Sequence, residues 1–331
     1  MGNYLVTGAA GFIAARVADM LLKDGHRVVG VDNMNDAYDV RMKDYRLRKL
    51  QKEPLFSFYE MDISDRQAMQ RLQSDTVEKA GFPGFDAIIN LAARAGVRAS
   101  VENPWVYVDT NVTGTLNLLE MAKNHNIHKF ILASTSSIYG ADAPLPTPEE
   151  ASSDRPLQSY AASKKGAEAL CHAYHYLFDI DVTIFRYFTV YGPAARPDMV
   201  MFRFTQWISE GKHVLLNGDG EQSRGFTYLD DIARGTILGL KPLGYEIINL
   251  GGHEAITINE LICILEERIG KKANVEHYPF HPADMLANQA DISKAKRLLN
   301  WEPEVSLQTG IANLVAWYNA ERSWASQIQT D

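Results

Sequence analysis

The sequence predicts an α/β fold, a doubly wound parallel sheet followed by a smaller mixed α/β lobe in the C-terminal part. Over the first 190 residues, short apolar or β-branched segments alternate with longer segments of helical periodicity, which is typical of βαβ units with right-handed crossovers. Segments such as AIINLA and FILAS are apolar throughout, as expected of strands covered on both faces. After about residue 190 the alternation stops, and Pro and Gly residues separate shorter segments.

The expected elements follow each other in a regular order. We expect strands at 4–7, 27–31, 56–61, 87–91, 130–134 and 182–187, and helices near 12–24, 40–52, 65–80, 105–125 and 159–178. Later helices are expected near 200–210, 257–269 and 305–323, and a further buried strand, 246–250, should return to the main sheet. The larger domain is therefore expected to comprise 1–190, with 228–251 returning to it, and the smaller lobe mainly 191–331.

Composition and charge exclude several classes of protein. The chain has 331 residues, of which 46% are hydrophobic and 22% charged, and its net charge is −8, whereas nucleic-acid binding needs clustered positive charge. No apolar run is long enough to span a bilayer, and the first residues lack the pattern of a secretory signal. The 2 cysteines show no metal-ligand spacing and fit a reducing compartment. We expect a cytoplasmic protein with no metal, nucleic-acid or membrane partner.

The segment NYLVTGAAGFIA predicts a turn that binds a dinucleotide. Gly8 would end the first strand, and Gly11 would let the backbone approach a pyrophosphate. The helix that begins at Phe12 and Ile13 would direct its N–H groups and its dipole at an anion. Ala14 stands where a third glycine is common, and it is still small enough for close packing.

Residues at the ends of the next strands extend the predicted cofactor site. Asp32, followed by Asn33, ends the second strand, where a carboxylate can accept a hydrogen bond from a ribose hydroxyl. No Arg or Lys stands directly after Asp32, which favours NAD over NADP. Asp62, followed by Ile63, ends the third strand and could either meet the adenine side or cap a helix. Small or apolar residues that would let the cofactor pass end the fourth strand: Leu91, Ala92 and Ala93.

A hydroxyl-rich strand end and a helix carry the candidate chemistry. The run STSSIYG ends the fifth strand, and YAASK opens the helix that follows. Tyr160 and Lys164 are four positions apart, so they share one helix face. A nearby ammonium and a positive nicotinamide ring would lower the pKa of the phenol from about 10. Thr135 could then hold a substrate alcohol while Tyr160 takes its proton.

With these motifs the sequence resembles the extended short-chain dehydrogenase/reductase family over nearly the whole chain. The resemblance rests on TGAAGFIA, Asp32, STSSIYG and YAASK. It implies a Rossmann domain that binds NAD and a C-terminal lobe that binds a nucleotide sugar. It also implies that Tyr160 and Lys164 contact the cofactor. Asn111, which shapes the helix next to the active site, and Tyr187 are likewise expected to belong to the cofactor site.

Local strings make the chain most similar to nucleotide-sugar 4-epimerases, in particular to those that act on UDP-glucuronate. These strings are DNMNDAYD, ARAGVRASVENP, FRYFTVYGPAARPDM and GFTYLDDIARG. Ser136 and Ser137 stand where related dehydratases carry an acid pair and related decarboxylases tend to carry a glutamate. Thr189 stands where UDP-galactose 4-epimerases usually have asparagine. Asn90, in place of a more usual histidine, is interpreted as a neutral packing change.

The resemblance implies a reaction and a set of substrate contacts. NAD would take hydride from C4 of a UDP-sugar and return it to the other face of the 4-keto intermediate, converting UDP-glucuronate to UDP-galacturonate. The expected substrate-binding residues are Arg98, Ser136, Ser137, Thr189, Arg196, Arg224 and Asp284. A homodimer through helices 105–125 and 159–178 is also implied. Three alternatives stay open: a neutral UDP-sugar 4-epimerase, a UDP-uronate decarboxylase and a non-catalytic NAD-sensing protein.

Overall fold

The computed structural model describes residues 1–80, 84–280 and 285–330. The elements of the first part are β1 (Asn3–Thr7), α1 (Phe12–Lys23), β2 (Arg27–Asp32), α2 (Val40–Leu50), β3 (Phe56–Glu60), α3 (Arg66–Ala80), β4 (Ala87–Asn90), α4 (Ala99–Glu102), α5 (Trp105–Tyr107), the π-helix η1 (Val108–Thr113), α6 (Gly114–Asn124), β5 (Lys129–Thr135), the 3₁₀ turn η2 (Ser136–Tyr139), α7 (Ser159–Phe178) and β6 (Asp181–Tyr187).

The elements of the second part are shorter and more mixed. They are β7 (Thr189–Tyr191), α8 (Val200–Glu210), β8 (His213–Asn217), β9 (Ser223–Tyr228), α9 (Leu229–Leu238), β10 (Tyr245–Leu250), β11 (Glu254–Thr257), α10 (Ile258–Ile269), β12 (Asn274–Tyr278), α11 (Ser293–Leu299) and α12 (Leu307–Ala325).

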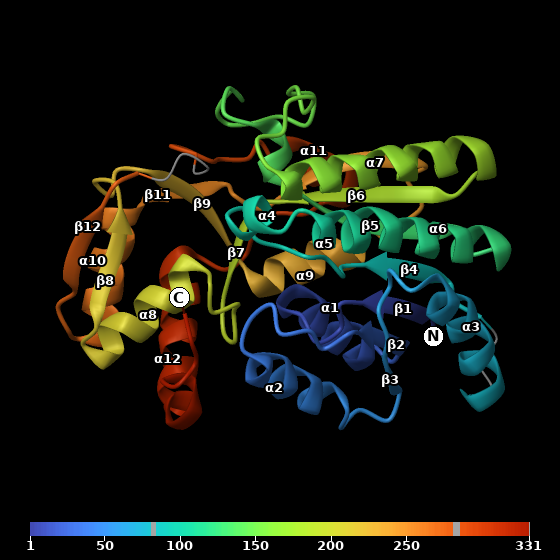
Figure 1. Cartoon of the computed structure of the whole chain (residues 1–331), viewed down its shortest axis with the longest axis horizontal. Coiled ribbons are helices and arrows are strands. Elements are labelled where there is room, and N and C mark those ends of the chain that lie inside the picture. The colour runs from blue at the N-terminus through green and yellow to red at the C-terminus, as the bar shows by residue number, and fades with distance from the viewer. Residues whose placement is uncertain (81–83, 281–284, 331) are drawn as a thin grey trace.

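The main sheet has seven strands in the order β10-β6-β5-β4-β1-β2-β3, all parallel, with helices on both faces (Figure 1). This confirms the predicted fold class. The six early strands lie within a residue or two of their predicted bounds, and β10 pairs with β6 at the edge of the sheet.

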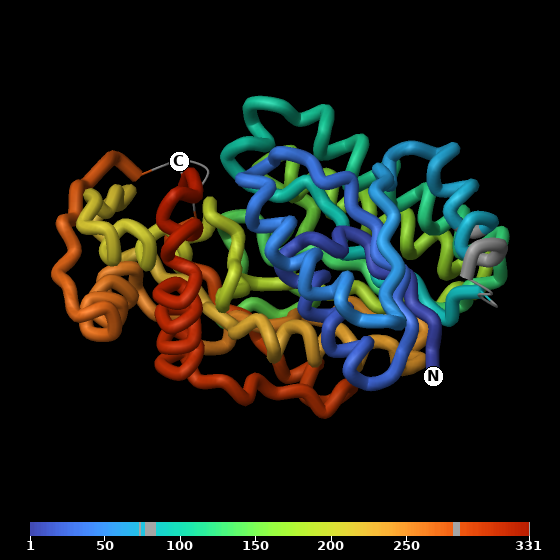
Figure 2. Tube along the Cα trace, turned by 90° about the horizontal axis from the view of Figure 1, so that it is seen from below, coloured from blue at the N-terminus to red at the C-terminus, as the bar shows by residue number. Residues whose placement is uncertain are grey.

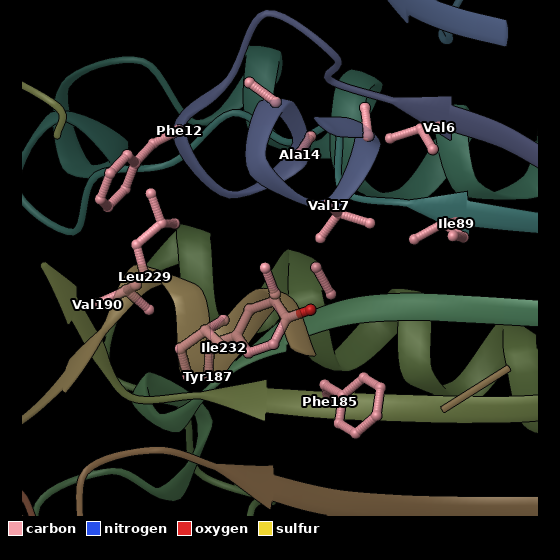
Figure 3. Close-up of a cluster of buried hydrophobic side chains, with 14 of the residues drawn as sticks. Val6, Phe12, Ala14, Val17, Ile89, Phe185, Tyr187, Val190, Leu229 and Ile232 are labelled. Carbon is pink, nitrogen blue, oxygen red and sulfur yellow. The ribbon is translucent and has the colours of Figure 1, made fainter. Parts of the chain in front are cut away.

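Successive side chains of the central strands point to opposite faces of the sheet, and both faces are covered, so most residues of these strands are apolar. Leu5 and Val6 are neighbours in β1, both are fully buried, and they belong to hydrophobic clusters on opposite faces of the sheet. One cluster is covered by α1, α2 and α9; Figure 3 shows Phe12 of α1 and Leu229 of α9 within it. Ala14 is buried in the same cluster, where its small side chain allows close packing.

The second lobe is built on two small sheets and a separate core. The sheets have the orders β11-β9-β7 and β12-β8, and α8, α10 and α12 pack around a third cluster that includes Trp207 and Leu261. Figures 1 and 2 show β8, β12, α8 and α10 at one end of the elongated molecule. The chain leaves this lobe through α9, which is tied to α1 because Arg16 donates to both carboxylate oxygens of Asp230, each at 2.8 Å.

Candidate active site

The carboxyl ends of β1 and β4 meet where the strand order reverses, which is the place where ligands bind in doubly wound sheets. Gly8 has a φ of +70°, and a Cβ on it would lie 2.9 Å from both Cα and N of Ala92. The Gly11 N–H donates to Gly8 O at 2.7 Å, and a Cβ on Gly11 would lie 2.7 Å from the same oxygen. Both positions of the turn therefore require glycine.

The turn leads directly into α1, whose first residues are Phe12 and Ile13. Gly11 is the N-cap, no side chain in the described part of the chain caps the helix, and its first turn carries no acidic residue. The first N–H groups and the positive end of the dipole are thus available to an anion. This arrangement fits the diphosphate of a dinucleotide.

The ends of β2 and β3 bring the predicted ribose and adenine contacts together. Asp32 accepts from the N–H groups of Ala10 at 3.2 Å and Met34 at 2.9 Å. Asn33 donates to Asp62 at 2.7 Å, which joins the two strand ends. Burial raises the pKa of Asp62, but hydrogen bonds from Ser64 and Asn33 outweigh it, and the net pKa is below the usual value.

Other predicted cofactor residues lie deeper. Ile63 is buried in the cluster under β3 and β4. Leu91, Ala92 and Ala93 follow β4 and are half-buried. Tyr187 pairs with Thr135 across β6 and β5, but its ring lies in the core cluster of Figure 3 and its hydroxyl bonds to Thr236 Oγ1 at 2.8 Å.

A chain of buried hydrogen bonds runs from β1 to the helices behind the site. Thr7 donates to Asn90 Oδ1 at 2.8 Å, and Asn90 donates to Thr115 Oγ1 at 3.1 Å. Thr115 in turn donates to the carbonyl oxygen of Asn111 at 2.7 Å. Asn90 therefore has a hydrogen-bonding role as well as a packing role.

Asn111 lies inside the helix expected at 105–125, which the structure forms from Trp105 to Asn124 with a π-helical turn between α5 and α6. Its side chain accepts from Arg94 N–H at 2.9 Å and donates to Arg94 O at 3.1 Å and to Ser163 Oγ at 2.9 Å. Asn111 belongs to η1, the π-helical segment between α5 and α6, and these bonds tie that segment to Arg94 and to α7. A local π-turn of this kind often accompanies a functional site.

Lys164 is held inside the protein on the helix that also carries Tyr160. Its ammonium donates to Ala133 O at 2.8 Å, and its side chain is buried. Burial lowers the pKa of Lys164 to about 8, although the negative charge of Glu168 opposes that shift. Glu168 is itself paired with Arg186 through two hydrogen bonds of 3.0 and 2.9 Å.

Tyr160 lies where the hydroxyl-rich end of β5 meets α7. Burial raises its pKa, while a hydrogen bond with Thr135 and the positive charge of Arg196 act in the opposite direction. The ring of Tyr107 meets the Tyr160 ring edge-on, with centroids 6.1 Å apart. The fold thus brings Thr135 and Tyr160 into contact, with Lys164 one turn further along the helix.

Three of the predicted substrate residues surround this group. Ser136 is buried and accepts from Asn288 Nδ2 at 3.1 Å. Ser137 accepts from Thr135 Oγ1 at 3.2 Å. Arg196 forms an ion pair with Asp198, with 3.0 Å between Nε and Oδ1, and its charge acts on Tyr160.

The remaining predicted substrate residues lie at the second lobe or outside the described part. Thr189 starts β7 and pairs with Phe226 of β9. Arg98 points to the end of β8: with its amide oxygen turned toward this arginine, Asn217 accepts two bonds of 3.2 and 2.8 Å. Arg224 lies in β9 and donates to Ser223 O at 2.8 Å. Asp284 lies outside the described residues.

Sequence reasoning missed three residues that reach the site from far along the chain. Asn288 contacts Ser136, which is 152 positions away. Lys43 lies 3.4 Å from Asp32 Oδ1, and Arg46 donates to Ala10 O at 2.8 Å. The basic pattern of 41–52 was the only local signal for the two cations, and it is equally typical of a solvated helix.

Two negative findings complete the description. Within 1–80, 84–280 and 285–330, no group of three or more His, Cys, Asp or Glu side chains could hold a metal ion. None of the helices in the described residues is long and apolar enough to cross a membrane. Cys171 is buried, Cys263 is exposed, and both are free.

Comparison with known proteins gives a consistent match. Residues 4–251 match the model of the NAD dependent epimerase/dehydratase family. A UDP-glucuronate 4-epimerase of Thermodesulfobacterium geofontis is 57% identical over 318 residues, which cover 96% of each chain. A probable UDP-glucuronate 4-epimerase of Rhizobium meliloti is 37% identical over 337 residues, covering 96% of this chain and 97% of the relative.

Solved structures of similar proteins have the same fold over nearly the whole chain. The UDP-glucuronic acid 4-epimerase of Bacillus cereus, in complex with UDP-glucuronic acid and NAD, superposes with a TM-score of 0.89 at 37% identity and covers 96% of this chain and 99% of that one. The UDP-glucose 4-epimerase of Thermotoga maritima, with UDP-glucose, superposes with a TM-score of 0.87 at 31% identity, covering 97% and 99%.

The buried ammonium of Lys164 predicts an unusual stability profile. We expect Lys164→Met to raise the free energy of unfolding of the cofactor-free protein at pH 7 by on the order of 2 kcal/mol. Burial lowers the pKa of Lys164 from 10.5 to about 8, so below about pH 8 the folded state carries a charge that the unfolded chain holds more easily. As pH rises from about 8 to 10.5, the folded state has lost this proton while the unfolded state keeps it, and the difference between the two proteins should vanish.

Urea unfolding of both proteins at pH 7 and pH 10 measures this difference. Lys165→Met is the control, because the neighbouring Lys165 side chain is partly exposed and bonds to Ser153. A Lys164→Met protein that is less stable than the wild type at pH 7 would contradict the prediction.

Proposed function

The chain belongs to the NAD dependent epimerase/dehydratase family, and we propose that it interconverts UDP-glucuronate and UDP-galacturonate by NAD-dependent epimerisation at C4. One observation carries the proposal. The Tyr160 hydroxyl is hydrogen-bonded to Thr135 beside a glycine-only dinucleotide turn, with the buried ammonium of Lys164 one turn away. The relatives that share this fold over nearly their whole length include UDP-glucuronate 4-epimerases.

The residues present fit NAD. A Cβ on Gly8 would clash with the backbone of Ala92 and one on Gly11 with Gly8 O, so the two glycines let the turn close tightly, and the uncapped start of α1 suits a diphosphate. Asp32 stands at the ribose position. When bound, NAD would accept hydride from C4 of the sugar and return it. We assign this cofactor to residues 1–190 with 228–251, and the nucleotide sugar mainly to 191–331.

Side chains of the protein would bind the C4 hydroxyl of the sugar and transfer its proton. Thr135 would hold the C4 hydroxyl, and Tyr160 would take its proton and later return it. Burial outweighs the opposing effects of Thr135 and Arg196, so the pKa of Tyr160 lies above its usual value. The positive charge of Arg196 favours the phenolate, and the positive nicotinamide ring of bound NAD would act in the same direction and bring the tyrosine toward the range in which it can act as a base.

A uronate needs its carboxylate held as well. Oxidation at C4 makes a β-keto acid, which tends to lose carbon dioxide. Ser136, Ser137, Thr189 and Arg196 offer three hydroxyls and a planar guanidinium, which matches carboxylate geometry. We propose that they hold the carboxylate out of alignment with the carbonyl π-system, so that hydride returns before carbon dioxide is lost.

We also propose that the protein is a cytoplasmic homodimer. Val101, Trp105 and Val108 are exposed apolar residues on α4, α5 and η1, and Trp105 is 77% exposed. They lie beside α7, which contacts α4, α5 and η1. A homodimer that pairs these helices would cover them. We place the protein in the cytoplasm, in keeping with its two free thiols.

Tyr160→Phe should lower kcat for UDP-glucuronate by roughly 10²- to 10⁴-fold, because the phenol that transfers the proton is removed. NAD content of the purified protein should stay the same. Tyr176→Phe, at an exposed tyrosine of the same helix, is the control. Chromatography of the nucleotide sugars gives the product: UDP-galacturonate supports the proposal, whereas a UDP-pentose alone, or turnover of neutral UDP-sugars alone, refutes it.

Arg196→Met should reduce turnover of UDP-glucuronate by about 10- to 100-fold, in line with the loss of a charge-assisted bond, and should increase a UDP-pentose by-product. Thr189→Val should act in the same direction with a smaller effect. Product ratios by chromatography measure both. If neither variant slows uronate turnover and no pentose forms, carboxylate binding at these residues is wrong.

Trp105→Glu should convert the dimer into monomers, because it places a charge in the proposed apolar interface. Light scattering after size-exclusion chromatography measures the mass of wild type and variant. A wild-type protein that elutes as a monomer at micromolar concentration would rule out this assembly.

A further inference from the structure

Arg46 of α2 connects the two parts of the active site. The side chain is only 5% exposed. Its Nε donates to Ala194 O at 3.0 Å, and its NH1 nitrogen donates to Ala10 O at 2.8 Å and to the hydroxyl of Tyr38 at 2.9 Å. Ala10 lies between the two glycines of the dinucleotide turn. Ala194 lies in 192–199, which we call the substrate loop because it carries Arg196.

Within the described residues, no carboxylate is hydrogen-bonded to the charge of Arg46. Its hydrogen-bond partners in the described residues are two carbonyls and one phenol, and none is a carboxylate. The NH2 nitrogen is buried and has no hydrogen-bond partner among those residues. A buried cation with an unused donor is costly. Nearby Lys43, by contrast, already has the carboxylate of Asp32 at 3.4 Å.

The hydrogen bond between Arg46 and Ala194 O stabilises the conformation of the substrate loop. Ala194 has a φ of +56°, an unfavourable conformation for a residue with a Cβ that surrounding contacts must maintain. Its carbonyl is held by Arg46. Two residues later, Arg196 acts on the charge of Tyr160. The position of the loop therefore bears on the proton transfer.

We infer that the NH2 nitrogen of Arg46 binds a phosphate oxygen of the bound dinucleotide, and that Arg46 thereby couples cofactor binding to the position of the substrate loop. A phosphate supplies the missing counter-charge and matches the planar donor fork of arginine. The site lies beside the turn that would hold the diphosphate, since Ala10 is a member of that turn. Arg46 acts as a positioning residue for 192–199. The inference rests on the proposed NAD binding but not on the identity of the sugar.

Arg46→Met keeps the aliphatic stem in the core and removes the charge and the donors. We expect its Kd for NAD to rise by about 10- to 100-fold, the effect of losing a hydrogen bond to a charged group, while Arg48→Met on the exposed face of the same helix leaves the Kd unchanged. Arg46→Lys, which keeps a charge but cannot reach all three partners, should restore part of the affinity. Calorimetric titration of stripped protein with NAD measures these constants.

Amide hydrogen exchange of residues 192–199 tests whether NAD binding changes the substrate loop, independently of how tightly NAD binds. In the wild type and in Arg48→Met, saturating NAD should slow amide exchange in this loop. In Arg46→Met, NAD at a concentration that saturates the weaker site should leave exchange in the loop unchanged, while the turn at 8–13 is still protected.

Three results would overturn the inference. They are an unchanged Kd in Arg46→Met, normal protection of 192–199 by NAD in that variant, and loss of affinity in Arg48→Met as well. If Arg46→Met does not fold, the Kd for NAD of Arg46→Lys is compared with that of Arg48→Met instead. Equal Kd values for these two variants refute the inference. Failure of the wild type itself to bind NAD would instead refute the proposed function.

Discussion

The active site depends on the close approach of two strand ends. β1 and β4 come so near each other at Gly8 and Ala92 that a single Cβ would separate them. The same approach lets the N–H of Ala92 donate to Thr7 Oγ1 at 3.2 Å, where the hydrogen-bond chain through Asn90 begins. That chain ends at Asn111, which donates to Ser163 on the helix that carries Tyr160. A change at the turn would therefore be felt at the position of α7.

Buried positive charge is the second feature of the site. Lys164 and Arg46 are both buried, and both donate to backbone carbonyls rather than to carboxylates. Arg186, in contrast, is neutralised by Glu168 behind the site. Uncompensated cations are unfavourable for stability, but they attract anionic ligands and favour a phenolate. The fold thus keeps buried positive charge beside the proposed cofactor and proton-transfer sites, and it neutralises Arg186 behind them.

Sequence patterns predicted the strands, the dinucleotide turn and the Tyr160–Lys164 pair, but misjudged features that depend on distant contacts. The helix expected at 105–125 contains a π-helical turn that the sequence did not predict, and there Asn111 bonds to backbone atoms of Arg94, outside the helix. No basic residue directly follows Asp32 in the sequence, but Lys43 of the next helix forms an ion pair with the Asp32 carboxylate. Asn288 gave no local signal at all.

By itself the sequence determined the fold class, the glycine turn typical of NAD binding and the likeness to nucleotide-sugar epimerases. These follow from short-range features: the period of apolar residues, glycines at fixed spacing and two side chains one helical turn apart. Only the tertiary structure decided which residues complete the site, among them Arg46 and Asn288. Such contacts join segments separated by long stretches of chain, and they form only when sheet, loop and lobe pack together, so no local pattern encodes them.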